Sequence, residues 1–237
     1  MMRTKNVLIL LSISLAIFPF MTTTSQELNQ LQINDDLTIY IEDIVRNFPS
    51  ISDERKEKLE EIADYIRSKQ TDQDTANLIF ICTHNSRRSH FAQIWAQTAA
   101  WYYGVNNVYC YSGGTEATAC NIRTVNALKR AGFQITPQDT VSKNPHYLVK
   151  YASTAPFIEA FSKKFDAETN PQQKFAAIMT CSQADQACPI VFGADRRIAI
   201  PYEDPKVSDT TAEEEAVYNE RCKQIATEMF FVFASLK

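Results

Sequence analysis

Residues 78–89 read Leu78-Ile-Phe-Ile-Cys82-Thr-His-Asn-Ser-Arg-Arg-Ser89, and this stretch decides the fold class. Its first five residues form a short, continuous apolar run, which is the pattern of a strand buried on both faces. The following segment, 89–103, is typical of a helix with an alanine-rich apolar side. A buried strand that leads directly into a helix is the repeating unit of an α/β protein with a parallel sheet.

The remainder of the chain continues this alternation. Together the segments predict an open parallel sheet of about four strands with helices on both faces. The further elements are strands at 108–112, 175–180 and 197–201, a helix at 121–130, and a C-terminal helix that opens near Thr210 and Thr211.

The sequence before the first strand divides into two predicted segments. Residues 1–25 combine the basic Arg3 and Lys5 with an apolar run and a small polar stretch, the pattern of a cleaved secretory signal peptide. We therefore expect export to the periplasm, with a cytoplasmic protein as the alternative if translation starts at Met21. Residues 26–76 show helical spacing and charged faces, which predicts a helical extension, and 77–237 is the predicted catalytic-type domain.

Composition excludes several classes of protein. A formal charge of −4 argues against a dedicated nucleic-acid binder. The five glycines cannot spell a dinucleotide-binding or a Walker motif, and the three histidines cannot form H-E-x-x-H. The six cysteines include no C-x-x-C pair, so we expect no metal site. Nothing in the sequence suggests oligomerisation, and a monomer is expected.

The loop after the first strand has the residues that an oxyanion-handling nucleophile needs. Ligands of open α/β sheets bind at the carboxyl ends of the strands, where a helix N-terminus offers free N–H groups. The thiolate of Cys82 would attack, Arg88 would grip two oxygens with its planar fork, and Ser89 would help to stabilise the thiolate. A lone buried cysteine is more often part of the core, but its combination with Asn85, Arg88 and Ser89 favours chemistry.

Residues 81–92 resemble the signature of the low-molecular-weight protein tyrosine phosphatase superfamily, which includes the thioredoxin-coupled arsenate reductases. Residues 109–116 are similar to the second strand and loop of that family, and 202–205 to its late Asp-Pro motif. Residues 180–189, with two cysteines seven apart, are similar to the redox segment of the reductase branch. The resemblance covers about 77–237 and implies the family's fold.

The resemblance implies a role for each residue of the site. Cys82 would be the nucleophile, Arg88 the oxyanion clamp and Asp204 the general acid that protonates the leaving oxygen. Asn85 would hold the loop through its side chain or simply serve turn chemistry, and Ser89 would support the thiolate, cap the helix, or both. The rest of the predicted oxyanion-binding loop consists of Thr83, His84, Ser86 and Arg87.

Cys181 and Cys188 would complete a thiol relay. In that scheme Cys181 attacks the arsenic adduct of Cys82 and releases arsenite, and Cys188 then forms a disulfide with Cys181. An external thiol reductant such as thioredoxin would regenerate the enzyme, and no bound cofactor is expected. The alternative is a structural disulfide or two idle thiols. Cys110, Cys120 and Cys222 are interpreted as core residues.

Four features depart from the family pattern. His84 replaces the usual glycine of the loop, and Arg87 stands where many members carry a second cysteine. Lys206 follows Asp-Pro where the phosphatases place an aromatic residue, which argues against a phosphotyrosine substrate. Residues 143–174 are longer than the corresponding connection of the family and could reshape the mouth of the site.

Three functions remain open on the sequence. The first is an arsenate reductase that uses Cys82, Cys181 and Cys188. The second is a phosphomonoester phosphatase that uses Cys82, Arg88 and Asp204 through a phosphocysteine intermediate. The third is a non-catalytic anion- or partner-binding module, which only His84 supports.

Overall fold

The computed structural model describes residue 24 and residues 32–139, 141–188 and 190–237. The predicted signal peptide, apart from Thr24, lies outside these residues. The centre of the fold is a four-stranded sheet with the order β2-β1-β6-β7, in which all neighbours are parallel. This confirms the predicted fold class. Its strands are β1 (Ala76–Cys82), β2 (Val108–Gly114), β6 (Phe175–Met179) and β7 (Ala194–Ala199).

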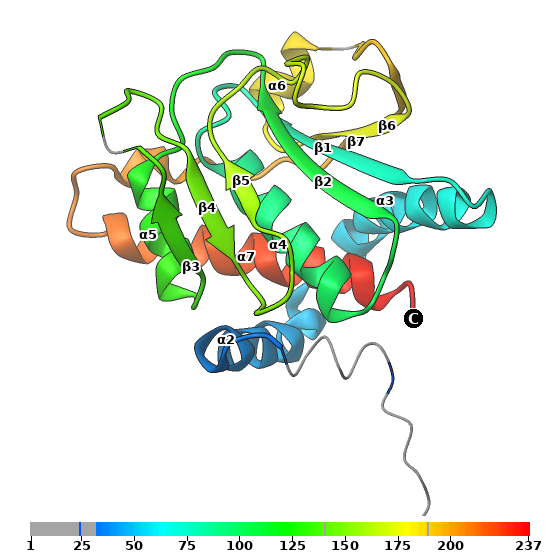
Figure 1. The fold of residues 1–237 in the computed structure, drawn as a ribbon, viewed down its shortest axis with the longest axis horizontal. Coiled ribbons are helices and arrows are strands. Elements are labelled where there is room, and N and C mark those ends of the chain that lie inside the picture. Colours follow the sequence, from blue (N-terminus) through cyan, green and yellow to red (C-terminus); the bar gives the residue numbers. More distant parts are fainter. Residues whose placement is uncertain (1–23, 25–31, 140, 189) are drawn as a thin grey trace, which may run out of the picture.

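The long helices lie on one face of this sheet (Figure 1). Helix α4 (Arg88–Tyr102) crosses behind β1 and β2 and packs against α7 (Glu214–Ala234), while α5 (Ile122–Arg130) also rests on α7. The C-terminal helix begins at Glu214 rather than near Thr210, because the carboxylate of Glu214 accepts the backbone N–H of Thr210 (2.6 Å) and ends the preceding turn. Negative charge at this end suits the helix dipole.

The opposite face of the sheet has a thinner cover. It is packed by the short helix α6 (Ser182–Ala187) and by apolar side chains from neighbouring loops, including Phe165 and Val191. The prediction of helices on both faces is therefore confirmed, but the two layers are unequal. The thin layer lies next to the strand end that carries Cys82.

Residues 32–76 form the predicted helical extension. Helix α2 (Asp35–Arg46), the 3-10 turn η1 (Phe48–Ser50) and helix α3 (Asp53–Thr71) follow one another. Each α-helix opens on a side-chain cap, since Asn34 accepts from the N–H of Leu37 and Ser52 from that of Arg55. Both helices pack on α7 and share its hydrophobic core. The division of the chain at residue 76 stays a prediction.

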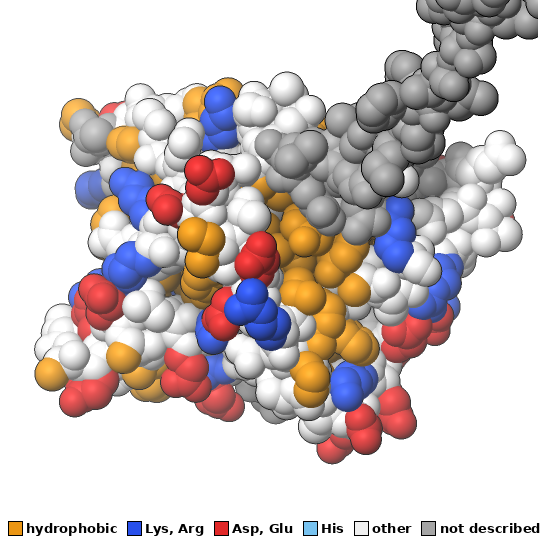
Figure 2. Space-filling model, turned by 90° about the horizontal axis from the view of Figure 1, so that it is seen from below, with side chains coloured by type: hydrophobic (Ala, Val, Ile, Leu, Met, Phe, Trp, Pro, Cys, Tyr) orange, Lys and Arg blue, Asp and Glu red, His pale blue; other side chains and the backbone are white. Residues whose placement is uncertain are grey.

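The face on which α2 lies is drawn in Figure 2. Apolar side chains gather in the middle of this face, and charged side chains surround them. Helix α2 itself buries Leu37, Ile41 and Ile44 and leaves Ile39 65% exposed. No helix among the described residues combines the length and the apolar character needed to cross a membrane.

A second sheet, which the sequence analysis did not predict, occupies the long connection after α5. It is antiparallel, with the order β3-β4-β5, and comprises β3 (Gln134–Pro137), β4 (Tyr147–Lys150) and β5 (Ile158–Ala160). Strands of three or four residues give too short a pattern to be recognised from alternation alone. Figure 1 shows this sheet beside the first one, with β5 next to β2 and over α4.

Candidate active site

The carboxyl ends of the four parallel strands bring the predicted site residues together. Cys82 is the last residue of β1 and pairs with Gly114 at the end of β2. Cys181 follows β6, and Asp204 lies in the segment after β7. In the sheet order, β2 lies on one side of β1, and β6 and β7 lie on the other. The strand order therefore reverses at β1, and open α/β sheets bind ligands at such a switch point.

Backbone geometry explains how the loop tolerates a histidine in place of glycine. The left-handed residue of the loop is Asn85, with φ = 44°, whereas His84 is not among the described residues with positive φ. Asparagine adopts this conformation more readily than most residues. The glycine-to-histidine departure therefore does not strain the loop. The His84 imidazole is partly exposed and lies 3.6 Å from a carboxylate oxygen of Glu116.

Gly114 is the glycine on which the loop depends. A Cβ atom there would lie 2.7 Å from both the backbone nitrogen of Asn85 and the carbonyl oxygen of Thr83, and 2.2 Å from the carbonyl of Glu116. Real Cβ atoms do not approach backbone atoms this closely, so any side chain at 114 would push the loop away from β2. The backbone N–H of Glu116 donates to the carbonyl of Thr83 (2.8 Å) across this contact.

A chain of hydrogen bonds ends at the Cys82 thiol. The Sγ atom of Cys82 lies 3.1 Å from the Oγ of Ser89, and the side-chain N–H of Asn85 donates to the same Oγ (2.9 Å). Ser89 therefore contacts the thiol, as predicted. Its alternative role as helix cap is wrong: α4 begins at Arg88 and its N-cap residue is Arg87, so Ser89 lies inside the first turn. Both Asn85 and Ser89 are fully buried.

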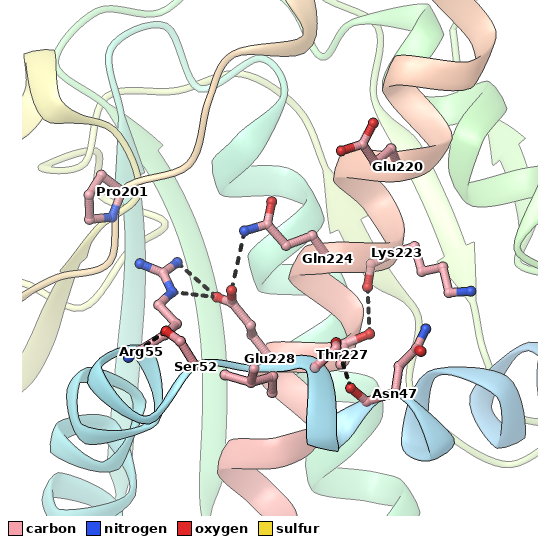
Figure 3. Close-up of a pocket in the computed structure, with 11 residues that line it drawn as sticks. Asn47, Ser52, Arg55, Pro201, Glu220, Lys223, Gln224, Thr227 and Glu228 are labelled. Carbon is pink, nitrogen blue, oxygen red and sulfur yellow. Dashed lines mark hydrogen bonds and ion pairs between the residues drawn. The ribbon is translucent and has the colours of Figure 1, made fainter.

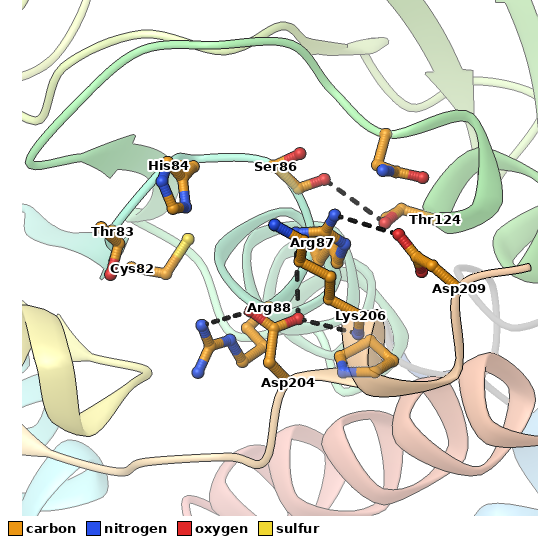
Figure 4. A network of polar contacts seen from close by, with 12 residues as sticks. Cys82, Thr83, His84, Ser86, Arg87, Arg88, Thr124, Asp204, Lys206 and Asp209 are labelled. Atoms are coloured by element: carbon orange, nitrogen blue, oxygen red, sulfur yellow. Dashed lines mark hydrogen bonds and ion pairs between the residues drawn. The ribbon is translucent and has the colours of Figure 1, made fainter.

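Arg88 and Asp204 face each other across the site (Figure 4). The Nη2 of Arg88 donates to Oδ2 of Asp204 (2.7 Å), and its Nη1 donates to the backbone carbonyl of Tyr202 (3.0 Å). The Nε of Arg88 is buried and has no hydrogen-bond partner among the described residues. The guanidinium thus keeps a buried donor that can bind an oxyanion while its other nitrogens fix its position.

Arg87 is a structural residue rather than a solvated one. It is 9% exposed, and its Nε donates to the hydroxyl of Tyr218 (2.8 Å), which in turn donates to Asp209 (2.7 Å). Its guanidinium also lies 3.8 Å from Asp204 and 3.6 Å from Asp209. Arg87 therefore ties the loop to the segment that carries Asp204.

The cysteines of the predicted relay lie at the two ends of α6. Cys181 is fully buried, and its Sγ lies 3.4 Å from the Oγ1 of Thr83, the residue next to the predicted nucleophile. Cys181 also caps α6 by accepting the N–H of Ala184 (3.3 Å). Cys188 follows the last turn and is partly exposed, and burial raises the pKa of its thiol. All six cysteines are free thiols.

Two further residues, one in the loop and one in the first turn of α4, have structural contacts. Ser86 donates from its hydroxyl to the carbonyl of Ala119 (2.7 Å), and its own carbonyl accepts from the hydroxyl of Thr124 (3.3 Å). His90, which the sequence analysis did not single out, is fully buried behind the loop, 3.3 Å from the hydroxyl of Ser112. Burial lowers the pKa of His90 to about 3, so this imidazole is neutral at physiological pH.

The extension braces the segment that holds Arg88. The ring of Tyr202, whose carbonyl accepts from Arg88, lies under the guanidinium of Arg55 in α3, 4.8 Å from its centroid. Arg55 in turn donates twice to one carboxylate oxygen of Glu228 in α7 (3.0 and 2.8 Å). Figure 3 shows this ion pair at the wall of a pocket of about 550 Å³ between α3 and α7.

This brace predicts a large stability effect at a residue far from the loop. Replacing Arg55 with Met leaves the Glu228 side chain, which is only 5% exposed, without its counter-charge. We expect a loss of about 3 kcal/mol in the free energy of unfolding, measured by urea denaturation. Arg46→Met is the matched control, because Arg46 and Glu42 form an exposed pair (74% and 56%), and it should change stability by less than about 0.5 kcal/mol. Equal effects of the two substitutions would contradict the brace.

Among the described residues, no group of three or more His, Cys, Asp and Glu side chains is arranged to hold a metal ion. The site itself offers three groups that can take part in chemistry. These are a thiol beside a hydroxyl, an arginine with a buried free donor and a carboxylate next to it. Such a set can bind a tetrahedral oxyanion and attack it with sulfur.

The comparison with protein families agrees with this geometry. Residues 77–145 match the model of the family described as low molecular weight phosphotyrosine protein phosphatase. This match confirms the resemblance carried by residues 81–92. It covers β1 and the loop with Cys82 and Arg88, and it does not extend to Cys181, Cys188 or Asp204.

Curated relatives and solved structures were also found. Arsenate reductase 2 of Staphylococcus epidermidis is 25% identical over 132 residues, which is 56% of this chain and 80% of the relative. The crystal structure of a YwlE mutant from Bacillus subtilis aligns with 68% of this chain and 99% of its own length, with 16% identity and a TM-score of 0.47. The structure of a thioredoxin-dependent arsenate reductase of Corynebacterium glutamicum aligns with 80% of this chain and 92% of its own length, with 13% identity and a TM-score of 0.34.

Proposed function

We propose that this protein is an arsenate reductase that works through three cysteines. The observation that carries the proposal is the contact of the buried Cys181 thiol with Thr83, the residue next to Cys82 (3.4 Å). A phosphatase needs one nucleophilic cysteine, whereas a reductase needs a second thiol within reach of the first. The similarity of this chain to two arsenate reductases of Staphylococcus epidermidis also supports the proposal.

In the first step the Cys82 thiolate attacks arsenic(V) of arsenate. A sulfur–arsenic bond forms and one arsenate oxygen leaves as water, protonated by Asp204. The buried Nε of Arg88 and the N–H groups at the start of α4 hold the remaining oxygens. The Ser89 hydroxyl, 3.1 Å from Sγ, stabilises the thiolate by hydrogen bonding.

In the second step Cys181 attacks the sulfur of the Cys82 adduct. The sulfur–arsenic bond breaks and its electron pair stays on arsenic, which leaves as arsenite, arsenic(III). The two cysteines lose two electrons in total and form the Cys82–Cys181 disulfide. Cys188 then attacks Cys181, releases Cys82 as a thiolate and forms the Cys181–Cys188 disulfide.

The last exchange requires a conformational change in α6. Cys181 and Cys188 are the caps of a six-residue helix, and seven residues of helix rise amount to roughly 10 Å. A disulfide needs Cα atoms within about 7 Å, so α6 must unwind for the bond to form. This helix of six residues on the thin side of the sheet is held by Arg197, which bonds Asp185 and the carbonyl of Cys188, so these bonds must break when α6 unwinds.

An external dithiol of the thioredoxin class would reduce the final disulfide. The partly exposed Cys188 is the sulfur that such a partner can reach. We further propose that residues 1–25 direct export, in which case the reductant must act outside the cytoplasm, because exported thiols meet an oxidising compartment. N-terminal sequencing of the mature protein from cell fractions tests this localisation, and an intact Met1 in the cytoplasmic fraction would contradict it.

The relay is tested by comparing the two cysteines of α6. Cys181→Ser should abolish arsenite release, because the adduct on Cys82 then has no internal thiol to attack it. Cys188→Ser should give one arsenite per enzyme and then stop at the Cys82–Cys181 disulfide. Single-turnover arsenite assays and mass spectrometry of the trapped disulfide measure both results. Cys222→Ala, a buried thiol that contacts Trp95 far from the loop, is the control and should turn over normally.

The same variants distinguish the second candidate, a phosphomonoester phosphatase. The position of Asp204 beside Arg88 (2.7 Å) favours it, since a carboxyl group next to the oxyanion clamp can protonate a leaving alcohol once a bound oxyanion has replaced it as the partner of the arginine. Hydrolysis of an aryl phosphate needs Cys82, Arg88, Asp204 and water, so it should survive Cys181→Ser. If both α6 variants reduced arsenate through many turnovers, the relay would be wrong and the phosphatase would be the better proposal.

A further inference from the structure

A second cleft lies on the far side of β2 from β1, between that strand, α4 and β5. Its volume is about 560 Å³, which is within the range of sites for small organic molecules. Aromatic side chains make up much of its wall, and Tyr109 and Phe157 remain more than half exposed there. One wall of the cleft is formed by β5 of the second sheet and the residues beside it.

A lysine side chain that is largely buried in this cleft has no ion-pair partner among the described residues. Lys163 is 8% exposed, and its Nζ lies over the ring of Phe161, 4.3 Å from the centroid. Among the described residues, no carboxylate lies within ion-pair distance of this Nζ; the nearby Glu159 is paired with His146 instead (2.7 Å). A buried charge normally has a partner, because its desolvation is costly.

A buried amide oxygen in the same cleft also has no partner. Gln97 uses both ends of its amide on the outer edge of β2, where it donates to the carbonyl of Val108 and accepts from the N–H of Cys110. Gln93, one turn earlier, donates to the carbonyl of Cys110 (3.2 Å), but its Oε1 has no hydrogen-bond partner among the described residues. Gln93 is only 5% exposed.

These observations define the ligand that the cleft fits. The ammonium of Lys163 requires an anion, the Oε1 of Gln93 requires a donor, and the walls offer aromatic faces for stacking. A single cation, with Glu159 also lining the cleft, matches a monoanion better than a phosphate dianion. We propose that this cleft binds a small aromatic carboxylate that also carries a hydroxyl or N–H group.

The backbone of Lys163 links this cleft to the candidate active site. Its N–H donates to the side-chain oxygen of Asn85 (2.9 Å), and its carbonyl accepts the N–H of Gly114 (2.9 Å). Asn85 in turn donates to Ser89, which contacts Cys82. A ligand that fixes Lys163 therefore acts on the loop that carries the Cys82 thiol, whichever reaction that thiol performs.

The test is calorimetric titration of the full chain with 4-hydroxyphenylacetate, in saturating inorganic phosphate. Phosphate occupies the anion-binding loop, so binding there is suppressed. We expect the carboxylate to bind at least tenfold more tightly than its neutral analogue 4-hydroxyphenylacetamide. Equal affinities of the two compounds, no binding of the acid, or its displacement by phosphate would overturn the proposal.

Variants locate the site independently of the ligand comparison. Lys163→Met should weaken binding of the acid at least tenfold, and Gln93→Leu should weaken it several-fold. Lys150→Met is the matched control: this ammonium lies 5.8 Å from the ring of Phe157 but does not line the cleft, and its loss should change the affinity less than twofold. Unchanged binding in Lys163→Met, with the fold intact by circular dichroism, would overturn the assignment.

The uptake of protons when the ligand binds gives a further readout. Burial lowers the pKa of Lys163 to about 8, against the opposing effect of Glu159. The other titratable groups around it, a neutral His90, the Cys120 thiol and the paired His146, supply no counter-ion. An anion bound beside Lys163 raises that pKa, so binding at pH 8 to 9 should take up protons, seen as a dependence of the heat on buffer. No proton uptake in this range would contradict the contact.

The link to the loop has its own measurement. The rate at which iodoacetamide alkylates Cys82, followed by mass spectrometry of the Cys82 peptide, should change at least threefold when 4-hydroxyphenylacetate saturates the cleft. The same addition to Lys163→Met should leave the rate unchanged. An unchanged rate in the wild-type protein would show a ligand site without coupling to the loop, and would overturn that part of the proposal.

Discussion

Cys82→Ser is expected to lose both arsenate reduction and aryl-phosphate hydrolysis, by at least about 10⁴-fold. Both reactions begin with attack by the same sulfur, and a serine hydroxyl at this position has no base to activate it. The hydroxyl of Ser89 contacts the nucleophile, and the amide of Asn85 contacts that hydroxyl, but neither group can accept the proton efficiently. Steady-state assays of the two reactions measure the loss.

A binding measurement separates lost chemistry from a lost fold. The loop is held by Asn85, Gly114 and the backbone bonds around Thr83, none of which needs the sulfur. Cys82→Ser should therefore still bind inorganic phosphate with an affinity close to that of the wild type. Cys110→Ala, a buried thiol on β2, serves as control and should keep both activities. Turnover above the reagent background in Cys82→Ser would contradict the role of this residue.

Arg88→Lys should be nearly as damaging as Arg88→Ala, with kcat/KM reduced about 10²- to 10³-fold in both. The guanidinium binds Tyr202 and Asp204 with two nitrogens and keeps a third, Nε, for the oxyanion. The single ammonium of lysine cannot hold this arrangement, since it lacks the planar fork. Its charge is retained, so a merely electrostatic role would leave the Lys variant close to the wild type.

The control for this substitution is Arg130→Lys. Arg130 bonds Asn219 and Glu215 on the surface, outside the loop, and its replacement should change kcat/KM less than twofold. The measurement is the ratio of kcat/KM in Arg88→Lys and Arg88→Ala for both substrates. A Lys variant within a few-fold of wild type would mean that Arg88 is not the clamp.

Much of the fold was predictable because its signals are local. The strand ending at Cys82 is a continuous apolar run, and it forms β1 as expected. Asn121, Gly132 and the apolar spacing between them place α5 within a residue of the prediction. The second sheet was missed, since strands such as Ile158–Ala160 are too short to show a period. The start of α7 was predicted a few residues too early. The side chain of Glu214, four residues after Thr210, accepts the N–H of Thr210 and holds a turn there instead of a helix.

The candidate site divides in the same way. Cys82, Asn85, Arg88 and Ser89 are neighbours along the chain, so their spacing alone brings them to one loop. That Cys181 lies against Thr83 follows only from the parallel pairing of β1 with β6. Contacts across strands do not leave a spacing in one sequence, so only the family resemblance pointed to Cys181.

The sequence by itself determined the nucleophile-type loop, its position between a strand and a helix, and the parallel sheet that carries it. Only the tertiary structure decided what surrounds that loop. It placed Lys163 against Asn85, Tyr202 against Arg88, and Arg55 of the extension against the ring of Tyr202. The physical reason is that local patterns fix elements through backbone geometry and burial, whereas buried polar groups find their partners only when distant elements pack together.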